Sequence, residues 1–273
     1  KIVGAVTHRT RLAVISHVTS ATALVLPIAE IVRRLAEAGV DTLVDGAHGP
    51  GMLPLDLDRL GAAYYAGNGH KWLCAPKGSG FLHVRRDRQE RIEPLVTSHG
   101  VNSPRVDRSR FLLEFDWTGT ADFSPWLSLP AAIQVVGGMA DGGWPAVMAA
   151  NRSLALEGAA IVHVALGLEP AAPKAMIGSM VAIPVPADLR PRAEGGAAVV
   201  DEDRTLPEDP LHGWLFEHER IQVPVFTWPA TSALGRPAQR LLRISAQRYN
   251  HRSQYARLAA VLAARPGAKA SGR

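Results

Sequence analysis

Two stretches decide the fold class of this sequence: Val44-Asp45-Gly46-Ala47-His48-Gly49 and Gly67-Asn68-Gly69-His70-Lys71-Trp72. Each follows a short apolar run that is typical of a buried strand, and each contains glycine where the chain must turn. Chemically active side chains therefore stand just beyond the ends of two predicted strands. Open α/β sheets bind their ligands at that carboxyl edge, so the two stretches predict such a sheet and a site on it.

Asp45 and Lys71 are the candidate site residues within these stretches. Gly46 flanks the carboxylate of Asp45, which favours contact with a ligand over a place in the core. Lys71 follows a Gly-Asn-Gly turn, whose small residues let the backbone approach a ligand closely. Trp72 comes next, so the lysine stem is expected in apolar surroundings, which make the amine a better nucleophile. Taken singly, each feature also fits a surface lysine or a turn-capping aspartate.

Strands and helices alternate through the first half of the chain. A helix is predicted to begin at Pro27 and to end at Gly39, and Asp56–Leu60 is a shorter helical segment. This alternation predicts an α/β sheet with helices on both faces. The predicted strands are Arg11–Ser16, Val40–Asp45, Tyr64–Gly67 and Gly80–Val84.

The second half has a different texture. Trp126–Met139 and Ala146–Leu166 are rich in helix formers, and beyond Pro170 short apolar runs alternate with proline-rich turns. We expect an incomplete large domain over residues 1–145, a linking helix over 146–170 and a smaller α+β domain over 171–273, with a disordered end from Pro266. The predicted elements of the last domain are strands Met176–Val185 and Arg240–Ser245 and helices Leu211–Arg220 and Ser253–Ala264.

Composition excludes some classes of protein. The 273 residues are 47% hydrophobic and 20% charged, as expected for a globular protein, and no stretch reaches the ~20 apolar residues of a membrane helix. Cys74 is the single cysteine, and no signal peptide opens the chain, so we expect a cytoplasmic protein. The net charge is +5, but acids interrupt the basic run Arg85–Arg91 and no aromatics interleave it. We therefore expect no membrane and no nucleic acid among the partners.

Common site motifs are absent. The sequence has no Gly-x-Gly-x-x-Gly, Walker A or Gly-x-Ser-x-Gly pattern. His212 and His218 are six residues apart and would share a helix face poorly, so a metal site is unsupported.

The order of several blocks resembles the class V aminotransferase family, which belongs to the fold-type I enzymes that use pyridoxal 5'-phosphate (PLP). Within the family, the chain looks most like the isopenicillin N epimerase-like and cysteine desulfurase-like members. The resemblance covers nearly the whole chain and implies the fold-type I architecture and a homodimer. The blocks are Ile15-Ser16-His17-Val18-Thr19-Ser20, Leu26-Pro27-Ile28, Asp45-Gly46-Ala47-His48, Gly69-His70-Lys71, Trp117-Thr118-Gly119-Thr120-Ala121-Asp122, Leu242-Arg243-Ile244-Ser245 and Tyr249-Asn250.

The resemblance implies a role for three residues near the ring of the cofactor. Lys71 would form an aldimine with PLP and later move the α-proton of the substrate. Asp45 would pair with the pyridinium nitrogen and keep the ring an electron sink. His48 would lie beside the phenolic oxygen.

Other roles implied by the resemblance concern the phosphate and the substrate. His70 would reach the phosphate, Thr120 would contact the phosphate of the partner subunit's site, and Arg243 would bind the substrate carboxylate. Asn68 stands where desulfurases usually have a phosphate-binding serine, and it can still donate a hydrogen bond. Ser20 stands near the ring where they often have asparagine.

Plainer interpretations stay open for four residues. Arg243 fits an ordinary surface arginine, and Thr120 fits a cap of the following helix. His17 fits a hydrogen-bonded core histidine, and Cys74 a small buried residue without persulfide chemistry.

Two departures from the family pattern stand out. Members carry an N-terminal portion with the phosphate-cupping turn and the ring-stacking residue, whereas this sequence begins at Lys1 inside the large domain. We therefore expect a fragment or a truncated paralogue whose sheet exposes apolar surface. Ala23 stands where desulfurases often have glycine.

We expect a PLP-dependent enzyme that acts on an amino acid or a peptide-like amine and is epimerase-like. A carbon–sulfur lyase or an aminotransferase is the first alternative, and a non-catalytic dimerisation or binding module is the second. Specificity would depend on the loop Thr97–Ser103 and on the turns after Arg190.

Overall fold

The computed structural model describes residues 1–186, 189, 209–229 and 237–264. The predicted disordered end from Pro266 and most of the turns after Arg190 lie outside these residues. The chain divides into two compact units, the first made of residues 1–18 and 27–138 and the second of residues 19–26 and those from 139 onward.

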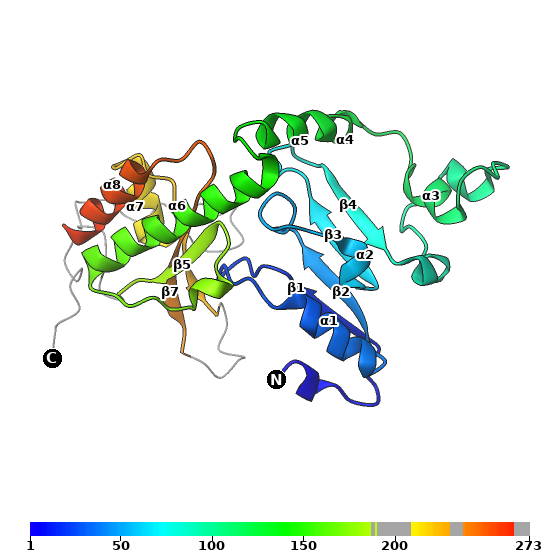
Figure 1. Cartoon of the computed structure of the whole chain (residues 1–273), viewed down its shortest axis with the longest axis horizontal. Helices are drawn as coiled ribbons and strands as arrows, with labels where there is room; N and C mark the ends of the chain where they lie inside the picture. Colours follow the sequence, from blue (N-terminus) through cyan, green and yellow to red (C-terminus); the bar gives the residue numbers. More distant parts are fainter. Residues whose placement is uncertain (187–188, 190–208, 230–236, 265–273) are drawn as a thin grey trace. The chain divides into compact units, whose positions relative to one another are not determined.

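A four-stranded sheet forms the centre of the first unit (Figure 1). Its order is β1-β2-β3-β4, with β1, β2 and β3 parallel and β4 antiparallel to β3. All four strands lie within one or two residues of their predicted positions. Their bounds are Leu12–Ser16 for β1, Asp41–Gly46 for β2, Tyr64–Asn68 for β3 and Gly80–Val84 for β4.

Helix α1, Ile28–Glu37, connects β1 to β2 and follows from its apolar pattern. Ile28, Ile31, Val32 and Leu35 recur at helical spacing and are the buried residues of the helix. Gly39 ends the segment as predicted, with a φ of +72° that suits glycine. The short helix α2, Leu57–Leu60, connects β2 to β3, and the side chain of Asp56 accepts a hydrogen bond from the backbone of Arg59 at its start.

One face of this sheet is exposed, which differs from the expected helices on both faces. Leu12, Val14 and Leu82 are 45%, 65% and 41% exposed and lie on the same face as Asp45. The strand order explains the difference. Because β1, β2 and β3 follow one another in a single direction, right-handed crossovers bring α1 and α2 to the same face.

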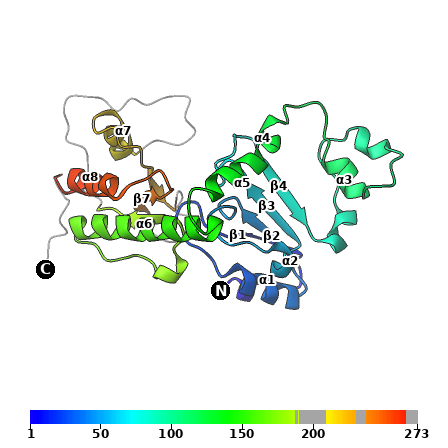
Figure 2. The same cartoon turned by 45° about the horizontal axis from the view of Figure 1, so that its top comes forward.

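Three further helices follow β4 in the first unit (Figure 2). They are α3, Arg110–Phe115, then α4, Ser124–Leu127, and α5, Leu129–Gly137. Helix α3 was not predicted. The single helix predicted over Trp126–Met139 is interrupted at Ser128 between α4 and α5, because Pro130 has no N–H to donate to the carbonyl of Trp126 one turn earlier. Short 3₁₀ turns span Val3–Ala5, Arg86–Arg91 and His99–Asn102 in this unit and Lys174–Met176 in the second.

The second unit packs helices on a three-stranded antiparallel sheet of order β5-β7-β6. Strand β7, Gln239–Ser245, matches its prediction. Strand β5, Met180–Pro184, begins four residues later than predicted, because Met176 belongs to a 3₁₀ turn. The strand β6, Val225–Trp228, was missed. The helices are α6, Gly143–Leu166, α7, Pro210–Glu217, and α8, Arg252–Ala263. Their core includes Val162, Ile183, Leu211, Leu215, Leu242 and Leu262.

Helices α6 and α8 pack closely because α6 has a glycine at the contact. A Cβ atom on Gly158 would lie 2.7 Å from the ring of Tyr255. The hydroxyl of Tyr255 donates to the carbonyl of Ser245 at 2.6 Å, which fixes the ring, and burial raises its pKa to about 12.

Residues 19–26 join the second unit through the backbone. Leu24 forms an antiparallel bridge with Ile177, and the N–H of Val25 donates to the carbonyl of Met176. Ala23 has a φ of +56° in this turn. That left-handed conformation suits glycine better than alanine. No helix in the described residues is long and apolar enough to cross a membrane.

Candidate active site

The two stretches that decide the fold meet at the carboxyl edge of the sheet. Strands β2 and β3 are parallel neighbours, with Asp45 opposite Ala66 and Gly46 opposite Gly67. The loops that follow the two strands therefore leave the sheet side by side, as predicted. One carries His48 and the other carries Lys71.

His48 lies between Lys71 and Trp72. Its Nε2 atom is 3.4 Å from the Nζ of Lys71, and its Nδ1 accepts a hydrogen bond of 3.2 Å from the indole Nε1 of Trp72. His48 and Trp72 are buried, whereas Lys71 is half-buried. The imidazole is thus held on one side by an indole and contacts the lysine amine on the other.

This geometry determines which atom of each pair carries a proton. The indole nitrogen of Trp72 can only donate, so Nδ1 of His48 has no proton and Nε2 carries one. Nε2 therefore donates to Nζ of Lys71, which must offer a lone pair. An ammonium group has none, so the arrangement favours the neutral and nucleophilic amine of Lys71.

Glycines let the loop after β2 pack tightly. A Cβ atom on Gly46 would lie 2.0 Å from the ring of Tyr65, and one on Gly51 would lie 2.7 Å from the backbone of Trp72. Gly51 also has a φ of +79°. Larger residues at these positions would displace the loop and with it His48.

The carboxylate of Asp45 is exposed and oriented by two hydrogen bonds. It accepts from the backbone N–H of Ala47 at 3.0 Å and from the hydroxyl of Ser16 at 3.4 Å. Below it, burial raises the pKa of the Tyr65 phenol, and the charge of Asp45 raises it further. Asp45 therefore presents a negative charge on the open face of the sheet.

Tyr65 and His17 form a buried pair under the site. The Tyr65 hydroxyl and Nδ1 of His17 are 3.1 Å apart, and burial lowers the pKa of His17. This confirms the plainer interpretation of His17 as a hydrogen-bonded core histidine.

Backbone hydrogen bonds connect the start of the loop around Lys71 to its middle and to its end. Gly69 donates to the carbonyl of Ser79, and Ala75 donates to that of Gly69. Nδ1 of His70 lies 3.2 Å from the same Ser79 carbonyl, to which it donates, and this contact orients the imidazole ring. Cys74 is exposed, not buried as expected, because the left-handed turn at φ +58° carries its side chain to the surface.

Two further predicted site residues, Asn68 and Thr120, belong to the first unit. Asn68 is half-buried at the end of β3. Thr120 is exposed in the connection between α3 and α4. Thr120 does not cap the next helix, because the carboxylate of Asp122 accepts from the backbone of Ser124 instead.

Ser20 and Arg243 belong to the second unit, where they contact each other. Nη1 of Arg243 donates to the carbonyl of Ser20 at 2.5 Å and to its hydroxyl at 3.3 Å. The guanidinium is half-buried, and its Nε is buried without a hydrogen-bond partner. Burial also lowers the pKa of Arg243, and no carboxylate of the described residues forms an ion pair with it. A desolvated cation of this kind favours an anionic ligand.

Trp72 and Ser79 were missed as parts of the site. Nothing in the periodicity around them distinguishes a hydrogen-bond partner from a core residue.

No three His, Cys, Asp or Glu side chains in the described parts of the chain are placed to hold a metal ion.

Comparisons with known proteins give a consistent family. The model of the family Aminotransferase class-V matches residues 1–160. The isopenicillin N epimerase of Amycolatopsis lactamdurans is 37% identical over 270 residues, which cover 93% of this chain and 60% of that protein. The probable L-cysteine desulfhydrase of Arabidopsis thaliana is 31% identical over 256 residues, with 92% and 50% covered.

A solved structure shares the fold. The cystine C–S lyase C-DES, in complex with its product cysteine persulfide, superposes with a TM-score of 0.70 over 96% of this chain and 63% of that one. At 24% identity, this likeness supports the fold alone. The chain spans half to about two thirds of the length of these three proteins.

We expect Lys71 to be the most reactive lysine of the folded chain at pH 7. Trace acetylation followed by peptide mass spectrometry should modify Lys71 at least about tenfold faster than exposed Lys77, because an ordinary lysine is almost wholly protonated at that pH. Trp72→Phe removes the proton donor to His48 and should reduce this advantage. Trp126→Phe, whose indole instead donates to Gly80, is the matched control. Equal rates for Lys71 and Lys77 in the unmodified chain would contradict the neutral amine.

Proposed function

The chain belongs to the class V aminotransferase family, and we propose that it is a PLP-dependent enzyme acting on an amino acid or a peptide-like amine. Contact between the Lys71 amine and the Nε2–H of His48 is the observation that carries this proposal. A covalent cofactor site needs a neutral amine, and this contact favours one in a half-buried position at the carboxyl edge of the sheet.

The residues around Lys71 fit the chemistry of PLP. The cofactor has an aldehyde, a ring nitrogen that is protonated when active, a phenolic oxygen and a phosphate. Lys71 offers an amine, Asp45 an exposed carboxylate and His48 an N–H. His70 and Asn68 offer polar groups on the same loop region. When bound, PLP withdraws electrons from the α-carbon of an attached amine and makes its proton acidic.

Lys71 would hold the cofactor and then act as the base at the α-carbon. The Nε2–H of His48 keeps the lone pair of Nζ directed and the amine unprotonated, so that it can accept the α-proton. Asp45 would hold a proton on the ring nitrogen, and its hydrogen bonds from Ala47 and Ser16 orient the carboxylate.

Four other residues complete the proposed cofactor site. His70 and Asn68 would bind the phosphate, and Ser20 would lie near the ring. We propose that Thr120 contacts the phosphate held by a second copy of the chain, which makes the working form a homodimer. The exposure of Thr120 leaves it available for such a contact.

Arg243 would bind the substrate carboxylate. Its guanidinium is already partly desolvated and donates hydrogen bonds to two neutral oxygens of Ser20. A carboxylate would supply both a hydrogen-bond acceptor and the missing negative charge. This feature favours α-amino acids over simple amines.

Among the possible reactions we favour an epimerase-like one, in which the α-proton is removed and returned to the other face. The 37% identity to isopenicillin N epimerase supports this choice. A carbon–sulfur lyase is the second candidate, because the identity to a probable L-cysteine desulfhydrase is 31%. Both begin with removal of the α-proton by Lys71. Release of sulfide from cysteine would distinguish the lyase from exchange of the α-proton alone.

PLP should bind stoichiometrically to the purified chain and produce a visible absorption band that survives dialysis. Lys71→Ala should abolish the dialysis-resistant band, because it removes the amine that holds the cofactor. Lys77→Ala changes an exposed lysine of the same loop and should leave the band unchanged. A folded chain that acquires no such band, or a band that persists in Lys71→Ala, would contradict the proposal.

Arg243→Gln should weaken the binding of alanine to the PLP-loaded protein by about tenfold or more, as expected for the loss of a charge-assisted hydrogen bond. Alaninamide lacks the carboxylate and should lose little affinity. Titrations followed by the absorption band measure both ligands. Arg252→Gln, which removes an exposed ion pair with Glu157, is the control. Equal losses for alanine and alaninamide would mean that Arg243 only supports the fold.

A further inference from the structure

The guanidinium of Arg243 is held in place by the oxygens of a single residue. Its Nη1 donates both to the carbonyl and to the hydroxyl of Ser20. Its Nη2 makes no hydrogen bond within the described residues and, unlike Nε, is not buried. Nη2 is therefore the donor that a ligand can reach, and the direction in which it points depends on where Ser20 lies.

Ser20 belongs to a turn that the side chain of Thr19 closes. The backbone N–H of Leu24 donates to Oγ1 of Thr19 at 2.9 Å, and the hydroxyls of Thr19 and Thr22 are 2.6 Å apart. The backbone N–H of Thr19 donates to the carbonyl of Leu24 at 3.0 Å. Thr19 thus connects the two ends of the turn, and Ser20 is the next residue along the chain.

The backbone of this turn includes a conformation that alanine rarely adopts. Ala23 has a φ of +56° and is fully buried. A left-handed residue with a Cβ atom persists only where the surrounding contacts hold it. The hydroxyl of Thr19 makes such contacts with Thr22 and Leu24, the residues on either side of Ala23. Loss of this hydroxyl would therefore allow the turn to relax.

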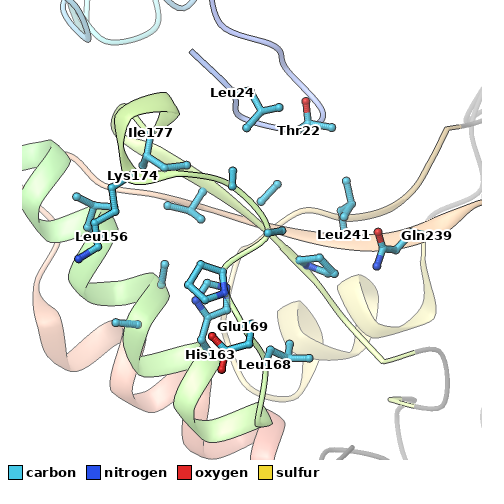
Figure 3. Close-up of a pocket in the computed structure, with 18 of the residues that line it drawn as sticks. Thr22, Leu24, Leu156, His163, Leu168, Glu169, Lys174, Ile177, Gln239 and Leu241 are labelled. Carbon is cyan, nitrogen blue, oxygen red and sulfur yellow. The ribbon is translucent and has the colours of Figure 1, made fainter. Parts of the chain in front are cut away.

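The far end of the turn is anchored to the segment before β5. Leu24 forms a backbone bridge with Ile177, and Figure 3 shows the two residues next to each other. Nε of Arg152 in turn donates to the carbonyl of Ile177 at 2.9 Å. All of these residues belong to the same unit as the guanidinium. Because the Leu24 end is fixed in this way, Thr19 determines where the Ser20 end lies.

We propose that Thr19 is a positioning residue for substrate recognition, whose hydroxyl directs the guanidinium of Arg243 through Ser20. The inference rests on the proposed function, in which Arg243 binds the carboxylate of the substrate. A guanidinium that is already oriented loses less conformational freedom when it binds a carboxylate, so the binding is tighter.

Thr19→Val removes the hydroxyl and keeps the shape of the side chain. It should weaken the binding of alanine to the PLP-loaded protein by about three- to tenfold, the range expected for one hydrogen bond, and leave alaninamide unchanged. Thr19→Ser keeps the hydroxyl and should restore most of the affinity for alanine. Thr10→Val is the matched control, because Thr10 also accepts from a backbone N–H through its hydroxyl but lies in the first unit. It should change neither affinity.

Combination with Arg243→Gln separates positioning from general support of the fold. If Thr19 acts through Arg243, Thr19→Val should weaken alanine binding by less than about twofold in the Arg243→Gln background, because effects on one shared interaction are not additive. Thr22→Val removes the other hydroxyl of the pair and should cause the same selective loss, which tests the turn even where Thr19→Val does not fold.

Three results would overturn the inference: unchanged alanine affinity in folded Thr19→Val, equal losses for alanine and alaninamide, or a loss that adds fully to that of Arg243→Gln. The PLP absorption band should persist in every variant and reports that each is folded. If Arg243→Gln itself leaves alanine binding unchanged, the proposed carboxylate site is wrong, so the two failures are distinguishable.

Discussion

The hydrogen bond from the indole of Trp72 to Nδ1 of His48 is the interaction on which the candidate site depends. It fixes the tautomer of the imidazole, and the tautomer in turn presents a proton to the amine of Lys71. Without that donor, His48 could turn either nitrogen toward the lysine or take up a proton. The charge state of Lys71, and with it the proposed covalent chemistry, would then no longer be set by the fold.

Packing beneath the site keeps this arrangement in place. Tyr65 fills the space under the loop after β2, and Gly46 is required there because any Cβ would collide with its ring. The tyrosine hydroxyl is paired with His17, which leaves this part of the core without an unsatisfied phenol. The parallel pairing of β2 with β3 then brings the Asp45 and Lys71 loops to one edge. Backbone topology and small residues position the site, and the polar side chains act within that frame.

Local patterns were enough to predict the strands of the first sheet and helix α1, because apolar runs and glycine turns lie in adjacent residues. They also predicted that Asp45 and Lys71 follow strands at the carboxyl edge of the sheet, whereas the role of His48 came from the family resemblance alone. Pairings between distant residues were not predictable in this way. Nothing next to Trp72 indicates that its indole reaches His48, and strand β6 gains its partner only from β7. The exposed face of the sheet depended on strand order, which no local pattern indicates.

The most direct measurement is the position of the cofactor on the chain. The PLP-loaded protein would be reduced with borohydride, digested and mapped by mass spectrometry, with Lys71, Lys77 and Lys174 as the lysines compared. The account predicts that the pyridoxyl group is found on Lys71, at close to one per chain, and that Trp72→Phe lowers this occupancy. Label spread over exposed lysines, or confined to one other than Lys71, would contradict it.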